Sequence, residues 1–229
     1  MKKAGRIKPF LALPFKKGTP LKITEGWFYS DEERKIHRHK FHRGIDFATD
    51  RGTPVYAPAD GWAISSFHYQ KRLSYQRKLI GLSLGNFVQI WHSDQKYFTQ
   101  YAHLESYEKS IPYFEPVKDG DVWYPSIVNY PIESLLKDAK FVKKGTLIGY
   151  VGDSGLSADF NEAPDHKTNR MKYPAWDETH LHFEIYQRTS TGRKKNQIDP
   201  FGIYGKFDQY SITGELWLTD KDGNILYAK

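Results

Sequence analysis

The sequence predicts a mainly β, antiparallel domain. Aromatic and β-branched residues alternate with polar residues in short runs, which is typical of half-buried strands. Gly, Pro and Asp separate these runs and mark turns. Only residues 132–139 have the character of a helix, and they fall within a long connection. With 229 residues the chain can bury a full core, and one domain is the default expectation.

Six runs are expected to form strands, and turn residues stand between them. The runs are residues 54–56, 61–67, 86–92, 97–103, 146–151 and 180–186. Turns are marked by Gly, Asp and Ser at 59–61, 119–121 and 152–155. Near the C-terminus, residues 215–219 and 224–228 flank Asp222-Gly223, which predicts a hairpin. The chain contains no internal repeat and no low-complexity segment.

Three stretches are longer than simple turns, and loops of that length in a compact domain are usually functional or disordered. They are residues 68–83, 105–140 and 156–178. The second and third are rich in aromatic residues, which favours packed, ordered loops over flexible tethers. Those residues are Tyr107, Tyr113, Phe114, Trp123, Tyr124 and Tyr130 in the second loop and Phe160, Tyr173 and Trp176 in the third.

The composition excludes several kinds of site. The chain has no cysteine, so disulfides, thiolate metal sites and a cysteine nucleophile are excluded. Any metal must therefore be held by nitrogen and oxygen ligands. The formal net charge of +7 and the pI of about 9.2 favour polyanionic surroundings, such as a cell wall, a membrane surface or nucleic acid. Nothing beyond charge favours nucleic acid, and we expect no nucleic-acid partner.

The first 21 residues are expected to form a basic arm. Seven Lys and Arg residues precede the first acidic residue, Glu25; a solvated arm and a binding device explain them equally well. The apolar run at 10–13 superficially resembles a secretion signal, but Pro14 interrupts it before it reaches the roughly 7–15 residues that a signal core needs. No apolar stretch approaches the roughly 20 residues of a membrane span. We therefore expect neither an export signal nor an integral membrane segment.

Histidines in three separate segments carry the chemistry. The first segment is His42-Arg-Gly-Ile-Asp46, the second is Tyr-Ala-His103-Leu, and the third is His180-Leu-His182-Phe-Glu184. Imidazole and carboxylate are the usual ligands of a catalytic zinc, which takes three protein ligands and leaves one position open. A lone histidine is more often structural, but together these segments supply more than three such groups. The surplus histidines are candidates for proton transfer.

The third segment has the alternation of a strand with two different faces. A period of two places His180, His182, Glu184 and Tyr186 on one face, and Leu181, Phe183 and Ile185 on the other, which is a core face. Residues opposite one another on paired strands lie about 5 Å apart, so a strand carrying His103 would bring a third imidazole close. The same alternation groups His103 with Tyr97, Thr99 and Tyr101.

Other polar residues support weaker statements. Glu184 is a candidate hydrogen-bond acceptor for an imidazole N–H, and a surface carboxylate explains it equally well. His37 and His39 belong to a basic stretch that we expect to be solvated, whereas His68, His92 and His166 have no partner in any motif. Gly44 is expected to permit a close approach of the backbone to the metal.

The motifs, taken together and in order, resemble those of the lysostaphin-type, or LytM-like, zinc peptidoglycan endopeptidases. The matching blocks are His42-x-Gly-x-Asp46, Ala57-Pro-Ala-Asp-Gly61, Tyr101-Ala-His-Leu104, residues 142–152 (Val-Lys-Lys-Gly-Thr-Leu-Ile-Gly-Tyr-Val-Gly) and His180-Leu-His-Phe-Glu184. They cover roughly residues 22–204 and include an Asp199-Pro200 of the kind that closes the family domain.

The resemblance implies a fold, a cofactor and a role for each matched residue. The fold would be an antiparallel two-sheet domain with an active-site cleft, a peptidase-like duplicated hybrid motif, here with long loop insertions. His42, Asp46 and His182 would hold Zn²⁺, and His103 and His180 would be the catalytic pair. The substrate would be peptidoglycan, cut in its stems or cross-links and met outside the cytoplasm, in the periplasm, in the cell wall or after secretion.

Two departures from the family pattern affect the expected substrate. About twenty extra residues precede the His-Leu-His motif, where Glu178-Thr179 replaces the usual Gly-Pro, and the stretch after His103 is also expanded. Both expansions adjoin catalytic histidines, so we expect them to form walls of the cleft. Of the properties that the resemblance implies, substrate preference is therefore the least well supported for this chain.

Two alternatives of other classes remain. One is a non-catalytic family member that binds or regulates a cell-wall hydrolase; such proteins typically lose ligands, whereas all five matched positions are present here. The other is a carrier module, since residues 57–61 and 142–152 also resemble biotinyl and lipoyl hairpins, but a carrier lysine at a hairpin tip is missing. We expect an arm at 1–21, a metallopeptidase domain at 22–204 and a packed hairpin at 205–229.

Overall fold

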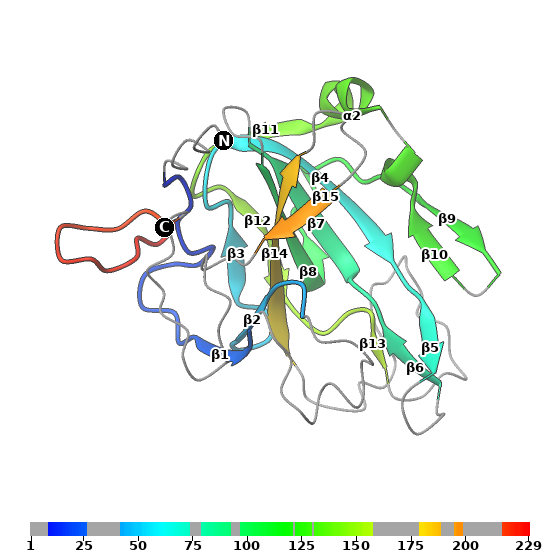
Figure 1. Cartoon of the computed structure of the whole chain (residues 1–229), viewed down its shortest axis with the longest axis horizontal. Helices are drawn as coiled ribbons and strands as arrows, with labels where there is room; N and C mark the ends of the chain where they lie inside the picture. The colour runs from blue at the N-terminus through cyan, green and yellow to red at the C-terminus, as the bar shows by residue number, and fades with distance from the viewer. Residues whose placement is uncertain are drawn as a thin grey trace, which may run out of the picture.

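An antiparallel sheet of ten strands forms the centre of the protein (Figure 1). The computed structural model describes residues 9–26, 42–73, 79–92, 97–120, 122–129, 131–157, 179–188, 195–198 and 217–229. Its strands are β1 (Lys22–Glu25), β2 (Ile45–Ala48), β3 (Pro54–Tyr56), β4 (Gly61–His68), β5 (Lys71–Leu73), β6 (Leu79–Leu82), β7 (Gly85–Trp91), β8 (Tyr97–Tyr107), β9 (Pro116–Asp119), β10 (Val122–Pro125), β11 (Lys140–Val142), β12 (Leu147–Val151), β13 (Leu156–Ser157), β14 (His180–Arg188) and β15 (Lys195–Ile198). Its helices are the 3₁₀ turn η1 (Ser126–Asn129) and α2 (Ile132–Asp138).

The order of the strands places β14 and β8 in the middle of the main sheet. The path runs β1-β2-β14-β8-β7-β4-β11, with β15 paired to β14 and with β12 joining β3 to β8. Two smaller sheets, β9–β10 and β5–β6–β13, accompany it. Every pairing between strands of the described residues is antiparallel. The predicted mainly β, antiparallel fold class is confirmed.

All six predicted strands and the predicted helix are present, as β3, β4, β7, β8, β12, β14 and α2. The sequence did not indicate several other short strands. Two of the expected loops contain such strands: residues 68–83 include β5 and β6, and residues 105–140 include β9, β10 and the first residue of β11. The aromatic-rich second loop is thus ordered. These elements were missed because three or four residues are too few to show a period of two; β3, equally short, was expected at residues 54–56.

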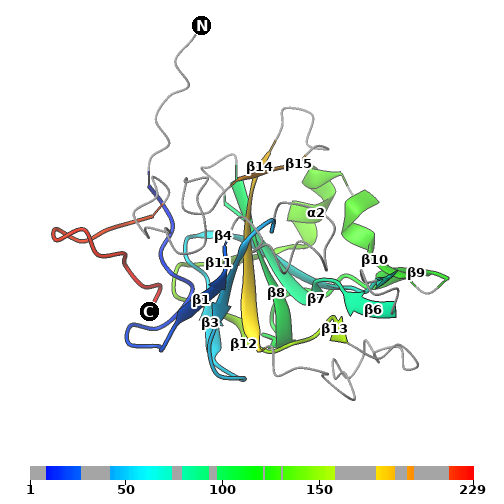
Figure 2. The same cartoon turned by 60° about the horizontal axis from the view of Figure 1, so that its bottom comes forward.

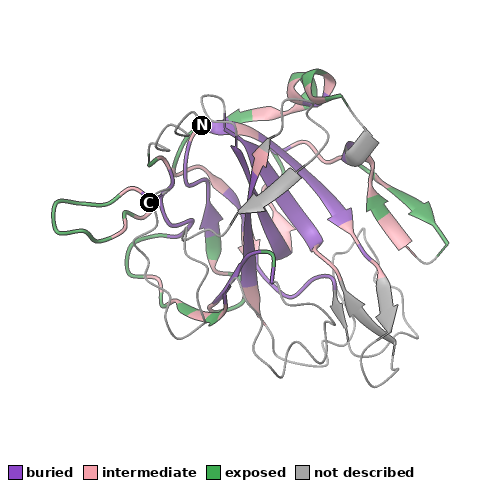
Figure 3. Cartoon of the chain, viewed as in Figure 1, coloured by how far each residue is buried: buried purple, intermediate pink, exposed green. Residues whose placement is uncertain are grey.

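The two faces of the central sheet bury different sets of side chains, and Figure 3 shows the central strands as buried. As predicted, Leu181, Phe183 and Ile185 of β14 belong to the largest core cluster. On the opposite face an aromatic row crosses the sheet, with Trp91 stacked on Phe98 at 4.3 Å and Phe98 stacked on Tyr186 at 4.7 Å. Side chains of η1 and α2 pack on that row. The histidine-bearing face is therefore aromatic at one end and polar at the other.

The first described segment, which begins at residue 9, lies beside the last, residues 217–229, on one flank of the sheet, where Figures 1 and 2 show the first segment in blue and the last in red. Leu11 is bridged to Trp217 and Leu13 to Tyr227, and Leu11, Leu13 and Trp217 belong to the largest core cluster. Part of the segment expected to be a basic arm is thus core. The division into arm, domain and hairpin stays a prediction.

The C-terminal turn at Asp222-Gly223 has the conformation of a tight connection. Thr219 and Ile225 form an antiparallel bridge, and Gly223 has a φ of 84°, which a residue with a side chain rarely adopts. None of the described helices is long and apolar enough to cross a membrane. The predictions for His37, His39, His166, Asp199-Pro200 and most of the third loop concern residues outside the described ranges.

His92, which the motifs leave unexplained, is a buried structural residue. Its Nδ1 donates to the carbonyl oxygen of Asp60 at 2.9 Å, and its Nε2 lies 3.0 Å from the hydroxyl of Thr99, which in turn contacts the hydroxyl of Tyr101 at 2.7 Å. Burial lowers the pKa of His92 from its ordinary value of 6.5 to about 4, although its contacts with Asp60 oppose this change. His92 is therefore neutral at physiological pH.

The low pKa of His92 predicts a pH-dependent share of the stability. Because the folded-state pKa lies below the unfolded one, this share is complete above pH 6.5 and is lost as the pH falls towards 4. The difference corresponds to about 3 kcal/mol of unfolding free energy. Urea unfolding of wild type and His92→Gln at pH 7.5 and pH 4.5 tests this. The variant should lose less stability between the two values, and an equal loss in both proteins would contradict the prediction.

Candidate metal centre

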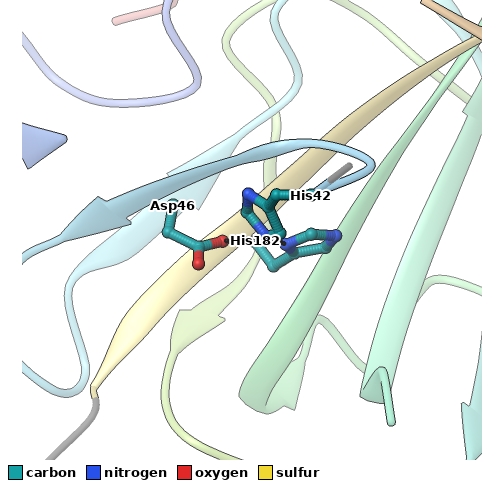
Figure 4. A group of neighbouring side chains, drawn as sticks. All are labelled: His42, Asp46 and His182. Carbon is teal, nitrogen blue, oxygen red and sulfur yellow. Dashed lines mark hydrogen bonds and ion pairs between the residues drawn. The ribbon is translucent and has the colours of Figure 1, made fainter. Parts of the chain in front are cut away.

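Two paired strands bring Asp46 and His182 together. In the antiparallel pairing of β2 with β14, Asp46 lies directly opposite His182 and Ile45 opposite Phe183. Side chains opposite one another on paired strands point to the same face. His42, just before β2, completes the group, and all three residues are at least nine-tenths buried. Figure 4 shows the three side chains converging.

The three converging atoms have the spacing of metal ligands. His42 Nε2 lies 2.9 Å from His182 Nδ1, His182 Nδ1 lies 2.8 Å from Asp46 Oδ1, and His42 Nε2 lies 3.3 Å from Asp46 Oδ1. Ligand atoms at about 2.0–2.1 Å from a tetrahedral zinc are about 3.3 Å from one another. Among the described residues, these three form the group of side chains with metal-binding geometry. Two nitrogens and one oxygen suit zinc.

The surrounding hydrogen bonds orient the two imidazoles. His42 Nδ1 donates to the carbonyl oxygen of Gly26 at 2.9 Å, which leaves Nε2 without a proton in the neutral ring. His182 Nε2 lies 3.4 Å from the Glu184 carboxylate, and its Nδ1 donates to Asp46 Oδ1 at 2.8 Å. A metal at the shared point would replace the proton on His182 Nδ1 and would then face one nitrogen of each ring. Partners of this kind orient ligating histidines and raise their basicity.

Gly44 has a steric role that differs from the expected approach to the metal. A Cβ at this position would lie 2.5 Å from the carbonyl oxygen of Phe183 and 3.0 Å from the His182 ring. No side chain fits there without moving β14. The glycine of the His42-x-Gly-x-Asp46 motif therefore lets the chain before β2 lie against the strand that carries His182.

His103 and His180 lie beside this group. The His103 ring centroid is 4.7 Å from that of His180 and 5.7 Å from that of His182. His103 Nδ1 donates to the carbonyl oxygen of Ser154 at 2.8 Å, so its Nε2 is the free acceptor of the neutral ring. His180 Nε2 lies 3.6 Å from Asp46 Oδ2. All five residues singled out by the sequence thus share one site.

His103 reaches the site by a route that simple alternation does not predict. Alternation groups His103 with Tyr101, but Tyr101 faces the core and contacts Phe183 at 5.4 Å. The register between β7 and β8 shifts at this point, and His103 has a φ of 59°, the only positive value for a non-glycine residue in the described ranges. This bulge turns the imidazole to the histidine face. The predicted proximity was right, but the alternation argument behind it was wrong.

Glu184 is the end of a buried polar chain that the sequence indicated only in part. Its carboxylate accepts hydrogen bonds from Gln100 and, at 2.8 Å, from the hydroxyl of Tyr186, and Gln89 donates to Gln100 at 2.5 Å. Glu184 is 3% exposed, so the alternative of a surface carboxylate is wrong. Gln100 was missed because only the register that pairs it with Glu184 reveals the contact.

The electrostatics of the site favour a cation. Burial by itself would raise the pKa of Asp46, but the three histidines around it lower that pKa well below its ordinary value. Burial by itself would lower the pKa of His182, but the hydrogen bonds and charges of Asp46 and Glu184 raise it to about 10. Without a metal, a proton on His182 therefore balances Asp46, and metal binding displaces that proton.

The pKa of His103 is shifted in the opposite direction to that of His182. Burial and the nearby His180 and His182 lower its pKa well below the ordinary value, and the contacts with Ser154 and Asp46 only partly oppose this. The ring is therefore neutral at physiological pH. A neutral imidazole beside a metal site is suited to accept a proton.

Glu184 is expected to strengthen metal binding through His182. Replacing Glu184 by Gln removes the charge that the His182 N–H faces, and losing such a partner typically costs about 10–100-fold in metal affinity. Chelator competition at pH 7.5 measures the zinc dissociation constant of the variant and of a control, Glu133→Gln, which lies on an exposed part of α2. Equal zinc affinity in Glu184→Gln and wild type would exclude this role.

Relatives and solved structures resemble the chain to different extents. An uncharacterised metalloprotease of Haemophilus influenzae is 29% identical over 116 residues, which cover 51% of this chain and 16% of that protein. A zinc-containing peptidase of Vibrio cholerae aligns with 83% of this chain and 39% of its own, at 24% identity and a TM-score of 0.41. The catalytic domain of lysostaphin, an antimicrobial peptidase of Staphylococcus simulans, aligns with 79% of this chain and 89% of its own, at 21% identity and a TM-score of 0.41.

A family match covers the first half of the site. Residues 40–122 match Peptidase family M23, and this stretch contains His42, Asp46 and His103. The second half of the site, on β14, completes the set with His180 and His182. The His-Asp-His group and the family match together identify zinc as the cofactor. Over less than half of its length, at residues 40–122, the chain thus resembles peptidase family M23.

Proposed function

We propose that this protein is a zinc-dependent metalloendopeptidase that hydrolyses peptide bonds in the stems or cross-links of peptidoglycan. In this proposal His42, Asp46 and His182 hold the zinc, and His103 and His180 handle protons. The observation that carries it is the convergence of these five side chains, from three distant segments, on one buried point. A structural metal site needs its ligands but does not need two further imidazoles beside them.

Each residue of the site has a chemical task. When bound, zinc supplies Lewis acidity that makes water a nucleophile near neutral pH and polarises a peptide carbonyl. His103 and His180 lie beside the ligand group, with their ring centroids 4.7 Å apart and His180 Nε2 3.6 Å from Asp46 Oδ2. One imidazole takes the proton from water, and the other donates to the developing oxyanion or to the leaving amine. We assign the proton transfer to the pair, because both rings lie within reach of the same point.

Peptidoglycan as the substrate is supported by the order of the motifs and by the charge of the chain. Five sequence blocks follow the order found in lysostaphin-type endopeptidases. The net charge of +7 suits an anionic cell envelope. This substrate places the site of action outside the cytoplasm, in the periplasm, in the wall or after secretion.

The metal assignment predicts a loss of zinc for each ligand variant. The purified protein should carry about one zinc per chain, and His42→Ala, Asp46→Ala and His182→Ala should each lose most of it, because two remaining ligands hold zinc weakly. Elemental analysis after dialysis against a weak chelator measures this. Circular dichroism of each variant shows that it is folded. Full zinc retention in all three variants would refute the assignment.

The catalytic assignment predicts a different result for the other two histidines. His103→Ala and His180→Ala should keep zinc but lose turnover by about 10²–10⁴-fold, the usual contribution of general acid or base catalysis. The assay digests purified walls of several cross-link types and identifies new amines and fragments by mass spectrometry. If wild-type protein with zinc bound releases no amine from any wall, a non-catalytic binding or regulatory role replaces the proposal.

A further inference from the structure

The turn formed by residues 152–155 contacts both histidines that we assign to proton transfer. The backbone N–H of His180 donates to the carbonyl oxygen of Gly152 at 3.2 Å. The side chain of His103 donates from Nδ1 to the carbonyl oxygen of Ser154 at 2.8 Å. Two carbonyls of one short turn therefore set the start of β14 and the orientation of the His103 ring.

This turn is packed tightly against the sheet. The hydroxyl of Ser154 donates to the carbonyl oxygen of Leu104 at 2.6 Å and accepts from the N–H of Asn86 at 2.9 Å. Gly155 faces Gly85 so closely that a Cβ on Gly155 would lie 2.2 Å from the Gly85 nitrogen. A small displacement of the turn would therefore also move the ring of His103.

Arg51 connects the turn to the strand that carries Asp46. Arg51 follows β2, and its guanidinium donates to both carboxylate oxygens of Asp153, with Nη1 at 2.9 Å from Oδ1. It also lies 3.6 Å from Glu105. Backbone hydrogen bonds strengthen the connection: Gly52 N–H donates to Val151 at 2.8 Å, and Val151 N–H donates to Thr53 at 2.9 Å. A bidentate contact of this kind fixes direction as well as distance.

We propose that the Arg51–Asp153 pair is a positioning device for catalysis. It holds the turn at 152–155 at a set distance from β2, and so holds His103 and His180 in register with Asp46. Neither residue belongs to the group that binds the metal, and both are therefore positioning residues. The inference rests on the proposed peptidase function.

An ion pair with no contact to the catalytic histidines should behave differently, and the protein contains one for comparison. Lys143 Nζ lies 2.8 Å from Asp60 Oδ2, with the lysine side chain 72% exposed. Exposed pairs of this kind contribute little. In the Arg51–Asp153 pair the side chains are 42% and 10% exposed, and Asp153 adjoins Ser154, whose carbonyl holds His103. Lys143→Met is therefore a matched control for the loss of an ion pair.

The test uses full-length zinc-loaded protein with Arg51→Met, Arg51→Lys, Asp153→Asn and Lys143→Met. Kinetics are measured on the peptide that wall digestion identifies as the substrate. We expect kcat to fall on the order of 10–100-fold for Arg51→Met and Asp153→Asn, because displacements of about 1 Å have effects of that size. KM and zinc affinity should stay within about twofold. Arg51→Lys keeps the positive charge but loses the bidentate guanidinium group. Its kcat should therefore lie between those of these two variants and that of wild type.

A second readout is independent of activity. Nitrogen-15 NMR of the histidine rings reports the tautomer of His103, which the Ser154 carbonyl holds as Nδ1–H. Arg51→Met and Asp153→Asn should shift or broaden this signal, whereas Lys143→Met should not. The proposal is overturned if the His103 signal is unchanged in both variants, or if their kcat stays within about twofold of the control. It is also overturned if zinc affinity falls in parallel with kcat. If wild type cuts no wall peptide, the proposed function fails, and the NMR result alone then decides whether the pair positions His103.

Discussion

The antiparallel pairing of β2 with β14 is the constraint on which the rest of the structure depends. It sets Asp46 opposite His182 on one face and buries Phe47 and Phe183 on the other. A slip of one residue would turn the polar side chains into the core and the apolar ones to the site, so core packing enforces the register of the metal group. The close approach of the chain before β2 needs Gly44 for the same reason. The strand register that buries the apolar face is thus the same register that sets the geometry of the site.

Backbone carbonyls and one buried carboxylate then orient the imidazoles. The carbonyl of Gly26 holds His42, that of Ser154 holds His103, and Glu184 faces the N–H of His182. Each partner accepts from one ring nitrogen and leaves the other nitrogen directed at the shared point. The rings are therefore oriented before any metal or substrate is bound, which reduces the reorganisation that catalysis requires. The Arg51–Asp153 pair extends the same principle by holding the turn that supplies one of these carbonyls.

The local pattern of apolar and polar residues predicted much of the fold, and the elements that it failed to predict were missed for physical reasons. The alternation on 180–186 predicted β14 and its core face, because Leu181, Phe183 and Ile185 stand at every second position. The short strands β5, β6, β9 and β10 inside expected loops were missed, since three or four residues carry no readable period. The burial of Leu11 and Leu13 was missed as well, because it depends on contact with residues near the other end of the chain, such as Trp217.

The sequence by itself determined the chemistry of the site. The absence of cysteine limited the metal ligands to nitrogen and oxygen, and the resemblance of the histidine motifs to a known family implied His42, Asp46 and His182 as the donors. Only the tertiary structure decided how those donors are directed. His103 faces the site through a bulge with a φ of 59°, against its alternation, and Gln100 and Arg51 join the network through residues 84 and 102 positions away. Residue type is a local property that can be read along the chain, whereas side-chain direction depends on register and backbone angles that long-range pairing imposes.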